Sequence, residues 1–349
     1  MGRRLRFLPP GQMVEVTCRT IHGRHLLEPS AALNEIVVGI VGRAQRLFGL
    51  PLHAIVVMSN HYHLLTSPGS ASDLARFMGY VNGNLAKEVG RFSGWREKVW
   101  GRRYQAIPVS DEEAAQVGRL KYLLSHGAKE GRVTSPLDWH GVHSWGGLLA
   151  DGLLRGAWFD RSREYEAGRR AGSCSPEVFT EPETMSLTPI PCWASLPPSE
   201  VRERLTDLLR SIEAEALAAF GARAGGQPAA PVEPAPGTPS PRGTSLRRRP
   251  APLCHAASRS VRAAFLEAYR LFVTEYREAS RRLRSGLEGA CFPPWSFPPA
   301  LPFVHGASSL RPTEERPPRP EARLGMSDQQ AGIAGGPGFS RGTAATRSR

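Results

Sequence analysis

The chain has few cysteines and no long apolar segment, and both absences exclude classes of protein. Its 349 residues include five cysteines, an odd number at scattered positions with no Cys-x-x-Cys pair. A disulfide framework needs paired cysteines and a zinc ribbon needs closely spaced ones, so neither is expected. No stretch reaches the ~18 apolar residues of a membrane span, and the N-terminus lacks the apolar run of a signal peptide. These features predict a soluble cytoplasmic protein with no membrane partner.

Acidic residues are scarce relative to basic ones. The chain contains 45 Lys and Arg against 32 Asp and Glu, which gives a formal net charge of +13 and a pI near 10.2. The basic surplus extends into the first 150 residues and is not confined to the tail. A balance of this kind favours a polyanionic partner, and nucleic acid is the usual one.

The first 150 residues carry the patterns of a compact α+β domain. Alternating apolar and polar residues predict strands, and apolar residues at helical spacing predict helices. Strands are expected at 13–20, 53–59, 61–67 and 103–109, and helices from about 30, from about 72 and over 110–127. The order β-α-β-β-α-β is that of a ferredoxin-like (RRM-like) sheet with two helices on one face. The third helix is an addition, and Ser110 with Glu113 predicts a capping box at its start.

The rest of the chain is predicted to be mostly helical and partly disordered. Its composition is rich in Gly, Pro and Ser, and it contains two amphipathic stretches. We expect a linker at 151–198, a helix at 199–222, a disordered linker at 223–256, a helical segment with a proline and aromatic stretch at 257–305, and a disordered basic tail at 306–349. Duplex DNA and partner proteins are both candidate ligands of these helices.

A pair of histidines stands in the third predicted strand. His61 and His63 are two residues apart, so their side chains are expected on the same face of the sheet. Both imidazoles can therefore bind a single metal ion. An isolated His-x-His is more often two ordinary surface or core histidines, so the interpretation depends on further residues.

Those further residues are Tyr122 and His126 in the helix predicted over 110–127. They are four residues apart, which places them on one helical face, away from the apolar stripe. If this face is turned toward the histidine strand, His126 completes a three-ligand site with an open coordination position. The alternatives are a half-buried amphipathic tyrosine and a histidine favoured by the negative end of the helix dipole.

These residue types suit cleavage of a phosphodiester. A tyrosine oxygen can attack DNA and form a covalent phosphotyrosine link, which divides one difficult displacement into two easier ones. Free tyrosine has a pKa of about 10 and is a weak nucleophile until activated. A divalent ion on the scissile phosphate neutralises charge and polarises the phosphate toward attack.

These motifs resemble those of the single-tyrosine HUH transposases, and most closely the REP-associated tyrosine transposases. The family carries His-hydrophobic-His on a central strand, which His61-Tyr62-His63 matches within MSNHYHLL. Its nucleophile stands on a later helix, where Tyr122 matches in RLKYLLSHGAKEG. The family's third metal ligand follows the tyrosine by four residues, usually as Asn or Gln, and here that position is His126. The resemblance covers residues 5–150.

The resemblance implies an activity and a set of partners. It implies DNA transposition on single-stranded DNA near a hairpin, through a 5′-phosphotyrosyl intermediate with a free 3′-hydroxyl. It implies Mg²⁺ or Mn²⁺ as the ion, although three imidazoles also suit Zn²⁺ or another transition metal. Some relatives are dimers and others monomers, so a homodimer is a candidate state.

Basic residues near the motifs are candidates for contacts with DNA phosphates. A solvated basic face is the alternative for each of them. They are Arg102, Arg103, Arg119, Lys121 and Lys129.

Three other functions compete with transposition. A ferredoxin-like sheet also serves as a non-cleaving nucleic-acid-binding module, which would need aromatic residues in its strands. A phosphoesterase working by water attack would not need Tyr122. A relative retained by its host as a DNA-processing endonuclease would keep the same chemistry.

Overall fold

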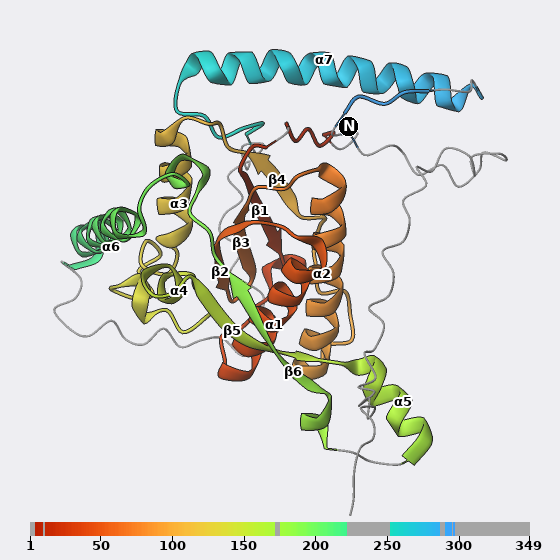
Figure 1. Ribbon diagram of the computed structural model, residues 1–349, viewed down its shortest axis with the longest axis vertical. Coiled ribbons are helices and arrows are strands. Elements are labelled where there is room, and N and C mark those ends of the chain that lie inside the picture. Colours follow the sequence, from red (N-terminus) through yellow and green to blue (C-terminus); the bar gives the residue numbers. More distant parts are fainter. Residues whose placement is uncertain are drawn as a thin grey trace, which may run out of the picture. The chain divides into compact units, whose positions relative to one another are not determined.

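Four antiparallel strands form the central sheet of the computed structural model, which describes residues 4–9, 11–171, 175–221, 252–286, 290–294 and 296 (Figure 1). The strands lie in the order β2-β3-β1-β4. They are β1 (Val14–Arg19), β2 (Leu52–Met58), β3 (His61–Thr66) and β4 (Gln105–Pro108). This order, with one helix between β1 and β2 and another between β3 and β4, confirms the predicted ferredoxin-like α+β fold.

Two long helices, α1 (Ala31–Phe48) and α2 (Ala71–Ser93), cover one face of the sheet (Figure 1). The Ser30 hydroxyl caps α1 by accepting from the Leu33 N–H, and Gly49 ends it in the left-handed conformation that glycine adopts without strain. A serine and a glycine begin and end α2 in the same way. The apolar faces of both helices pack against alternate strand residues and form the main core.

The opposite face of the sheet carries a second core under three other helices. They are α3 (Glu113–Leu124), α4 (Trp145–Leu149) and α6 (Pro198–Phe220). Trp145 is fully buried among them, and its indole N–H donates to the Leu124 carbonyl at 3.2 Å. Short 3-10 helices lie at Ile21–Gly23, Pro136–Asp138, Pro176–Phe179 and Pro191–Trp193.

Residues 151–198 are not the linker that the sequence predicted. They contain β5 (Leu153–Phe159), α5 (Arg161–Ala171) and β6 (Thr180–Ser186), and the two strands pair antiparallel along their full length. The prediction was wrong because both strands are half exposed, β5 contains a glycine and β6 a proline, so they lack the regular alternation that marks a strand in a sequence.

The β5–β6 hairpin is fastened to α1 by close backbone packing and by ion pairs. A Cβ atom added at Gly39 would overlap the Ala157 backbone, so only glycine allows this approach. Glu183 is buried and pairs with Arg43 at 3.0 Å and Arg46 at 2.5 Å. The hairpin is therefore an integral layer on the helical side.

The C-terminal extension contributes α7 (Arg259–Arg284), the helix expected within 257–305. The ring of Phe7, in the N-terminal segment, lies 4.8 Å from that of Phe272 on α7. Residues 252–256, expected as disordered, instead run alongside the end of β4, where the His255 N–H donates to the Pro108 carbonyl at 2.8 Å. The rest of that linker and the tail at 306–349 lie outside the described residues.

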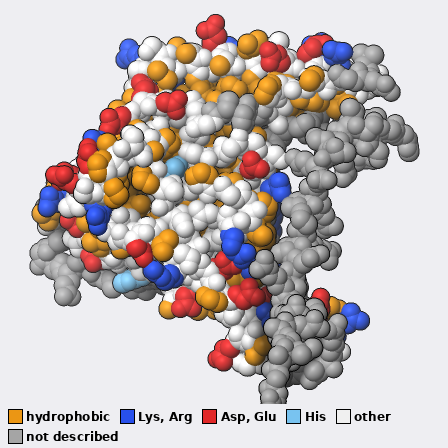
Figure 2. Space-filling view, in the orientation of Figure 1, with side chains coloured by type: hydrophobic (Ala, Val, Ile, Leu, Met, Phe, Trp, Pro, Cys, Tyr) orange, Lys and Arg blue, Asp and Glu red, His pale blue; other side chains and the backbone are white. Residues whose placement is uncertain are grey.

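The surface in Figure 2 does not by itself mark a path for a ligand. Basic and acidic side chains are interspersed over the face shown, with no continuous patch of either sign. The net charge of +13 is thus not gathered on this face.

Among the described residues, no helix combines the length and apolar character that a membrane crossing requires.

We expect Gly39→Ala to destabilise the protein by about 1–3 kcal/mol, because the added methyl overpacks α1 against β5. The matched control is Gly79→Ala, in the exposed part of α2, where a Cβ meets no atom within 4 Å. That substitution is expected to raise stability by up to about 1 kcal/mol. The free energy of unfolding from urea titration measures both, and equal effects would contradict the close packing.

Candidate metal and tyrosine site

Three histidines meet on the sheet face that lies under α3. His61 and His63 are alternate residues of β3, so their side chains leave the same face of the sheet. His126 lies in the turn after α3, with its ring centroid 4.4 Å from that of His63 and 5.8 Å from that of His61. One candidate ligand atom from each imidazole lies within 4.8 Å of the others. The three predicted ligands are therefore brought together.

Helix α3 is shorter at both ends than the predicted range 110–127. The predicted capping box is absent, because the Ser110 hydroxyl donates to the Glu112 carboxylate at 2.7 Å and caps no backbone N–H. Turns replace the expected last turn of the helix. Tyr122 and His126 nevertheless lie side by side, with ring centroids 5.0 Å apart, as the spacing predicted.

Each of the three imidazoles uses its Nδ1 atom for a contact with an oxygen acceptor. The partners are Asn60 Oδ1 at 2.6 Å for His61, Glu15 Oε1 at 2.9 Å for His63 and the Leu123 carbonyl oxygen at 2.9 Å for His126. Because these oxygens accept, Nδ1 carries the proton and the lone pair remains on Nε2. This is how metal-binding histidines are usually oriented.

The protonation states also suit a metal ion. Burial, together with the neighbouring His63 and Lys129, lowers the pKa of His61 to about 3 and that of His126 to about 2. These two imidazoles are therefore neutral at pH 7, as a metal ligand must be. The three histidines can bind a metal ion, and their nitrogen donors fit a divalent one.

Lys129 shares this space. Its Nζ atom lies 3.1 Å from His126 Nε2 and 3.4 Å from the centroid of the Tyr122 ring. Burial lowers the pKa of Lys129 to about 8. An ion bound to His126 requires this ammonium group to turn away from Nε2, and the Tyr122 carbonyl oxygen, 3.4 Å from Nζ, is an acceptor already in reach.

A buried carboxylate that the sequence analysis missed supports the site from β1. Glu15 is only 3 % exposed, and its oxygens lie 2.9 Å from His63 Nδ1 and 2.7 Å from Arg119 Nη2. Burial alone would raise the pKa of Glu15, but His255, His63 and Arg119 together hold it well below its ordinary value. The available signal was a lone acid, flanked by Val14 and Val16, in a strand whose neighbour carries the histidines.

The C-terminal extension reaches the same carboxylate. His255 Nε2 lies 2.8 Å from Glu15 Oε2, on the oxygen that also faces Arg119. The backbone of His255 is held between Pro108 and Ser110 by two hydrogen bonds of 2.8 Å. The segment before α7 is therefore part of the support of the site, which nothing in the sequence of the extension predicted.

Tyr122 is the most accessible member of the cluster, with 40 % of its surface exposed. The Arg119 guanidinium lies over the Tyr122 ring, 3.9 Å from the ring centroid, and also contacts Glu15. Burial raises the pKa of Tyr122, while the charge of Arg119 acts to lower it. The tyrosine borders a cavity of about 470 Å³ between α3 and α6, which Lys121, Lys129 and Phe220 also line.

The five predicted DNA-contacting residues divide into separate groups. Arg119 and Lys129 lie at Tyr122, as described above. Lys121 lines the same cavity but pairs with Glu215 of α6 at 2.6 Å. Arg102 and Arg103 lie elsewhere, beside β4, in a different cavity. Their roles in DNA binding stay predictions.

Residues 16–123 match the family model described as "Transposase IS200 like". This match confirms the family resemblance over a span that includes His61, His63 and Tyr122. Comparison with curated proteins gives no match.

Two solved structures are similar to this chain. One is a REP-associated tyrosine transposase bound to a REP hairpin, with 17% identity, coverage of 44% of this chain and 87% of that chain, and a TM-score of 0.37. The other is a protein from Deinococcus radiodurans described as a transposase, with 19% identity, coverage of 34% and 95%, and a TM-score of 0.26.

We expect Glu15→Gln to weaken binding of Mn²⁺ by roughly 10- to 100-fold, because the amide no longer holds His63 as strongly through Nδ1. The matched control is Glu88→Gln, another buried carboxylate, which pairs with Arg161 and Arg91 away from the histidines. Isothermal titration calorimetry on both variants, with circular dichroism to confirm folding, measures the effect. Wild-type affinity in Glu15→Gln would show that the carboxylate does not support the metal.

Proposed function

We propose that this protein cuts and rejoins single-stranded DNA with Tyr122 as nucleophile, beside a divalent metal ion held by His61, His63 and His126, and so acts in DNA transposition. The observation that carries the proposal is the convergence of a half-exposed tyrosine, three clustered imidazoles and Arg119 on one sheet face. The match of residues 16–123 to IS200-like transposases supports it.

The covalent step follows from the position of the phenol. The Tyr122 oxygen attacks the scissile phosphorus, a P–O bond to the tyrosine forms, and the bond to the 3′ oxygen breaks. The phenol proton is lost and the leaving 3′ oxygen takes up a proton, so the products are a 5′-phosphotyrosyl link and a 3′-hydroxyl. A 3′-hydroxyl of another strand reverses the step and rejoins DNA.

Protein side chains supply charge for this step from two directions. Arg119 is fixed by Glu15 at 2.7 Å and lies 3.9 Å from the Tyr122 ring, so its guanidinium stabilises negative charge at the phenol oxygen. Lys129 lies on the same ring and can pair with a phosphate oxygen. A divalent ion at the three histidines would polarise the phosphate and favour departure of the 3′ oxygen.

The ion is proposed to be Mg²⁺ or Mn²⁺, on the strength of the resemblance. The donor set also suits Zn²⁺ or another transition ion, since imidazole nitrogen is a good ligand for these. A hairpin-forming strand is the proposed substrate and a homodimer a candidate assembly, both on the same grounds.

The competing functions are less well supported by the geometry. A sheet that binds RNA needs an open face, whereas here α1 and α2 cover one face and α3, α4 and α6 pack on the other. Water attack gives no role to a tyrosine beside the three histidines. Retention by a host for DNA processing would use the chemistry proposed here.

The decisive substitution is Tyr122→Phe, which removes only the attacking oxygen. A library of hairpin oligonucleotides with a 3′ label is incubated with the protein and Mn²⁺ or Mg²⁺ and separated on a denaturing protein gel. We expect labelled protein with the wild type, none with Tyr122→Phe, and none with EDTA. The matched control, Tyr165→Phe, changes an exposed tyrosine of α5 and should leave the adduct at wild-type yield.

Other outcomes would contradict the proposal. An adduct that persists in Tyr122→Phe assigns the nucleophile to another residue. Free cleaved DNA without any adduct indicates water attack. Binding without cleavage under every metal and hairpin indicates a non-cleaving module.

A further inference from the structure

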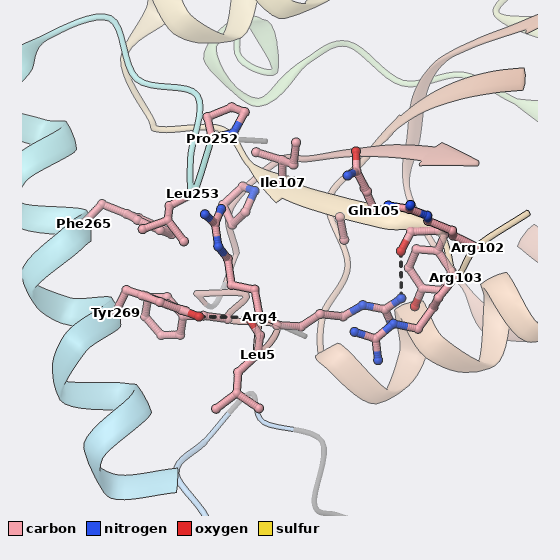
Figure 3. Close-up of a pocket in the computed structure, with 15 residues that line it drawn as sticks. Arg4, Leu5, Arg102, Arg103, Gln105, Ile107, Pro252, Leu253, Phe265 and Tyr269 are labelled. Atoms are coloured by element: carbon pink, nitrogen blue, oxygen red, sulfur yellow. Dashed lines mark hydrogen bonds between the residues drawn. The ribbon is translucent and has the colours of Figure 1, made fainter. Parts of the chain in front are cut away.

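Two adjoining cavities of about 370 and 660 Å³ form a groove along α7, and they share Arg4, Leu5 and Tyr269. Figure 3 shows the residues that line the smaller of the two. We call this the α7 groove. Its walls are the N-terminal segment, β4 with the residues before it, the segment before α7, and α7 itself. The groove therefore depends on parts of the chain outside the residues 16–123 that match transposases.

The described lining of the α7 groove is rich in arginine and contains no acidic residue. The arginines are Arg4, Arg6, Arg102, Arg103, Arg277, Arg281 and Arg284. Arg281 pairs with Glu278 of the same helix at 2.5 Å, but Arg102, Arg103, Arg277 and Arg284 form no ion pair with any described residue. Guanidinium groups gathered without counter-charges attract phosphates, because each can donate to two phosphate oxygens.

Aromatic rings lie between these arginines. Phe265, Tyr269 and Tyr276 line the groove from α7, where their rings also pack against Phe7 and Phe272. Tyr104 lines the part beside β4, with the Arg6 guanidinium 3.7 Å from its ring centroid. The Tyr269 hydroxyl donates to the Leu5 carbonyl at 3.4 Å, which fixes the N-terminal segment against α7 (Figure 3). Rings interleaved with cations are the pattern that binds unpaired bases together with their phosphates. A duplex offers phosphates but keeps its base faces stacked inside.

We infer that the α7 groove binds single-stranded DNA outside the catalytic cluster. The choice of DNA among polyanions rests on the proposed function, whereas the choice of a single strand rests on the rings and arginines. The groove is joined to the site by a short stretch of chain, since Leu253 lines the groove and His255, two residues on, contacts Glu15. A bound strand would thus lie close to Glu15 and His255, which support the three histidines. This would give α7 a function in DNA binding.

The test uses the full chain with the Tyr122→Phe substitution in EDTA, so that no cleavage occurs. Binding of fluorescent 30-nucleotide oligothymidylate is followed by anisotropy across a range of KCl. The groove variant is Arg277→Gln with Arg284→Gln. The matched control is Lys87→Gln with Arg282→Gln, which removes two exposed positive charges outside the groove lining. All four positions are exposed, and thermal melting checks that both variants stay folded.

We expect the groove variant to bind roughly tenfold more weakly. The plot of the logarithm of its binding constant against the logarithm of salt concentration should be less steep by about 1.4, or about 0.7 for each lost phosphate contact. The control variant should stay within about twofold of the parent. Wild-type affinity in the groove variant, or an equal loss in the control, would overturn the inference. Tighter binding of a duplex would overturn the single-strand assignment, and tighter binding of oligouridylate would overturn DNA.

This result separates the two proposals. Unchanged groove binding in a protein that never forms the Tyr122 adduct counts against the proposed function alone. If the groove variant forms the Tyr122 adduct at wild-type yield and binds DNA in EDTA with wild-type affinity, the result counts against the groove proposal alone.

Discussion

A single buried carboxylate organises the candidate site. Glu15 is removed from water in β1, its charge is paired with Arg119 of α3, and its oxygens also contact His63 and His255. A buried charge that loses its partner costs about 3–5 kcal/mol, so these groups are held where Glu15 requires them. Through them the carboxylate joins β1 to β3, to the tyrosine helix and to the segment before α7.

The two faces of the sheet have different roles. One face buries apolar residues under α1 and α2 and supplies most of the core. On the other face, Arg119 and Tyr122 lie on the side of α3 that meets the histidine strand, and His126 follows in the turn after α3. Docking of α3 by its arginine therefore positions the phenol and the third imidazole at the same time.

Much of this arrangement could be predicted from local patterns. The strand period placed His61 and His63 on one face, and the four-residue spacing placed Tyr122 beside His126. Glu15 left only a weak signal, because a polar residue in an alternating strand is expected to face solvent until the helix that covers it is known. The β5–β6 hairpin was missed for a related reason, since its stability comes from contacts with α1, distant in sequence, and not from its own pattern. The same holds for the approach of His255.

The central claim is that three imidazoles present Nε2 atoms to one ion beside a nucleophilic tyrosine. Anomalous diffraction from crystals grown with Mn²⁺ tests it most directly. The account predicts one strong peak within bonding distance of Nε2 of His61, His63 and His126, with the Tyr122 hydroxyl facing the open side of the ion. A peak elsewhere, or histidines that bind the ion through Nδ1, would contradict it.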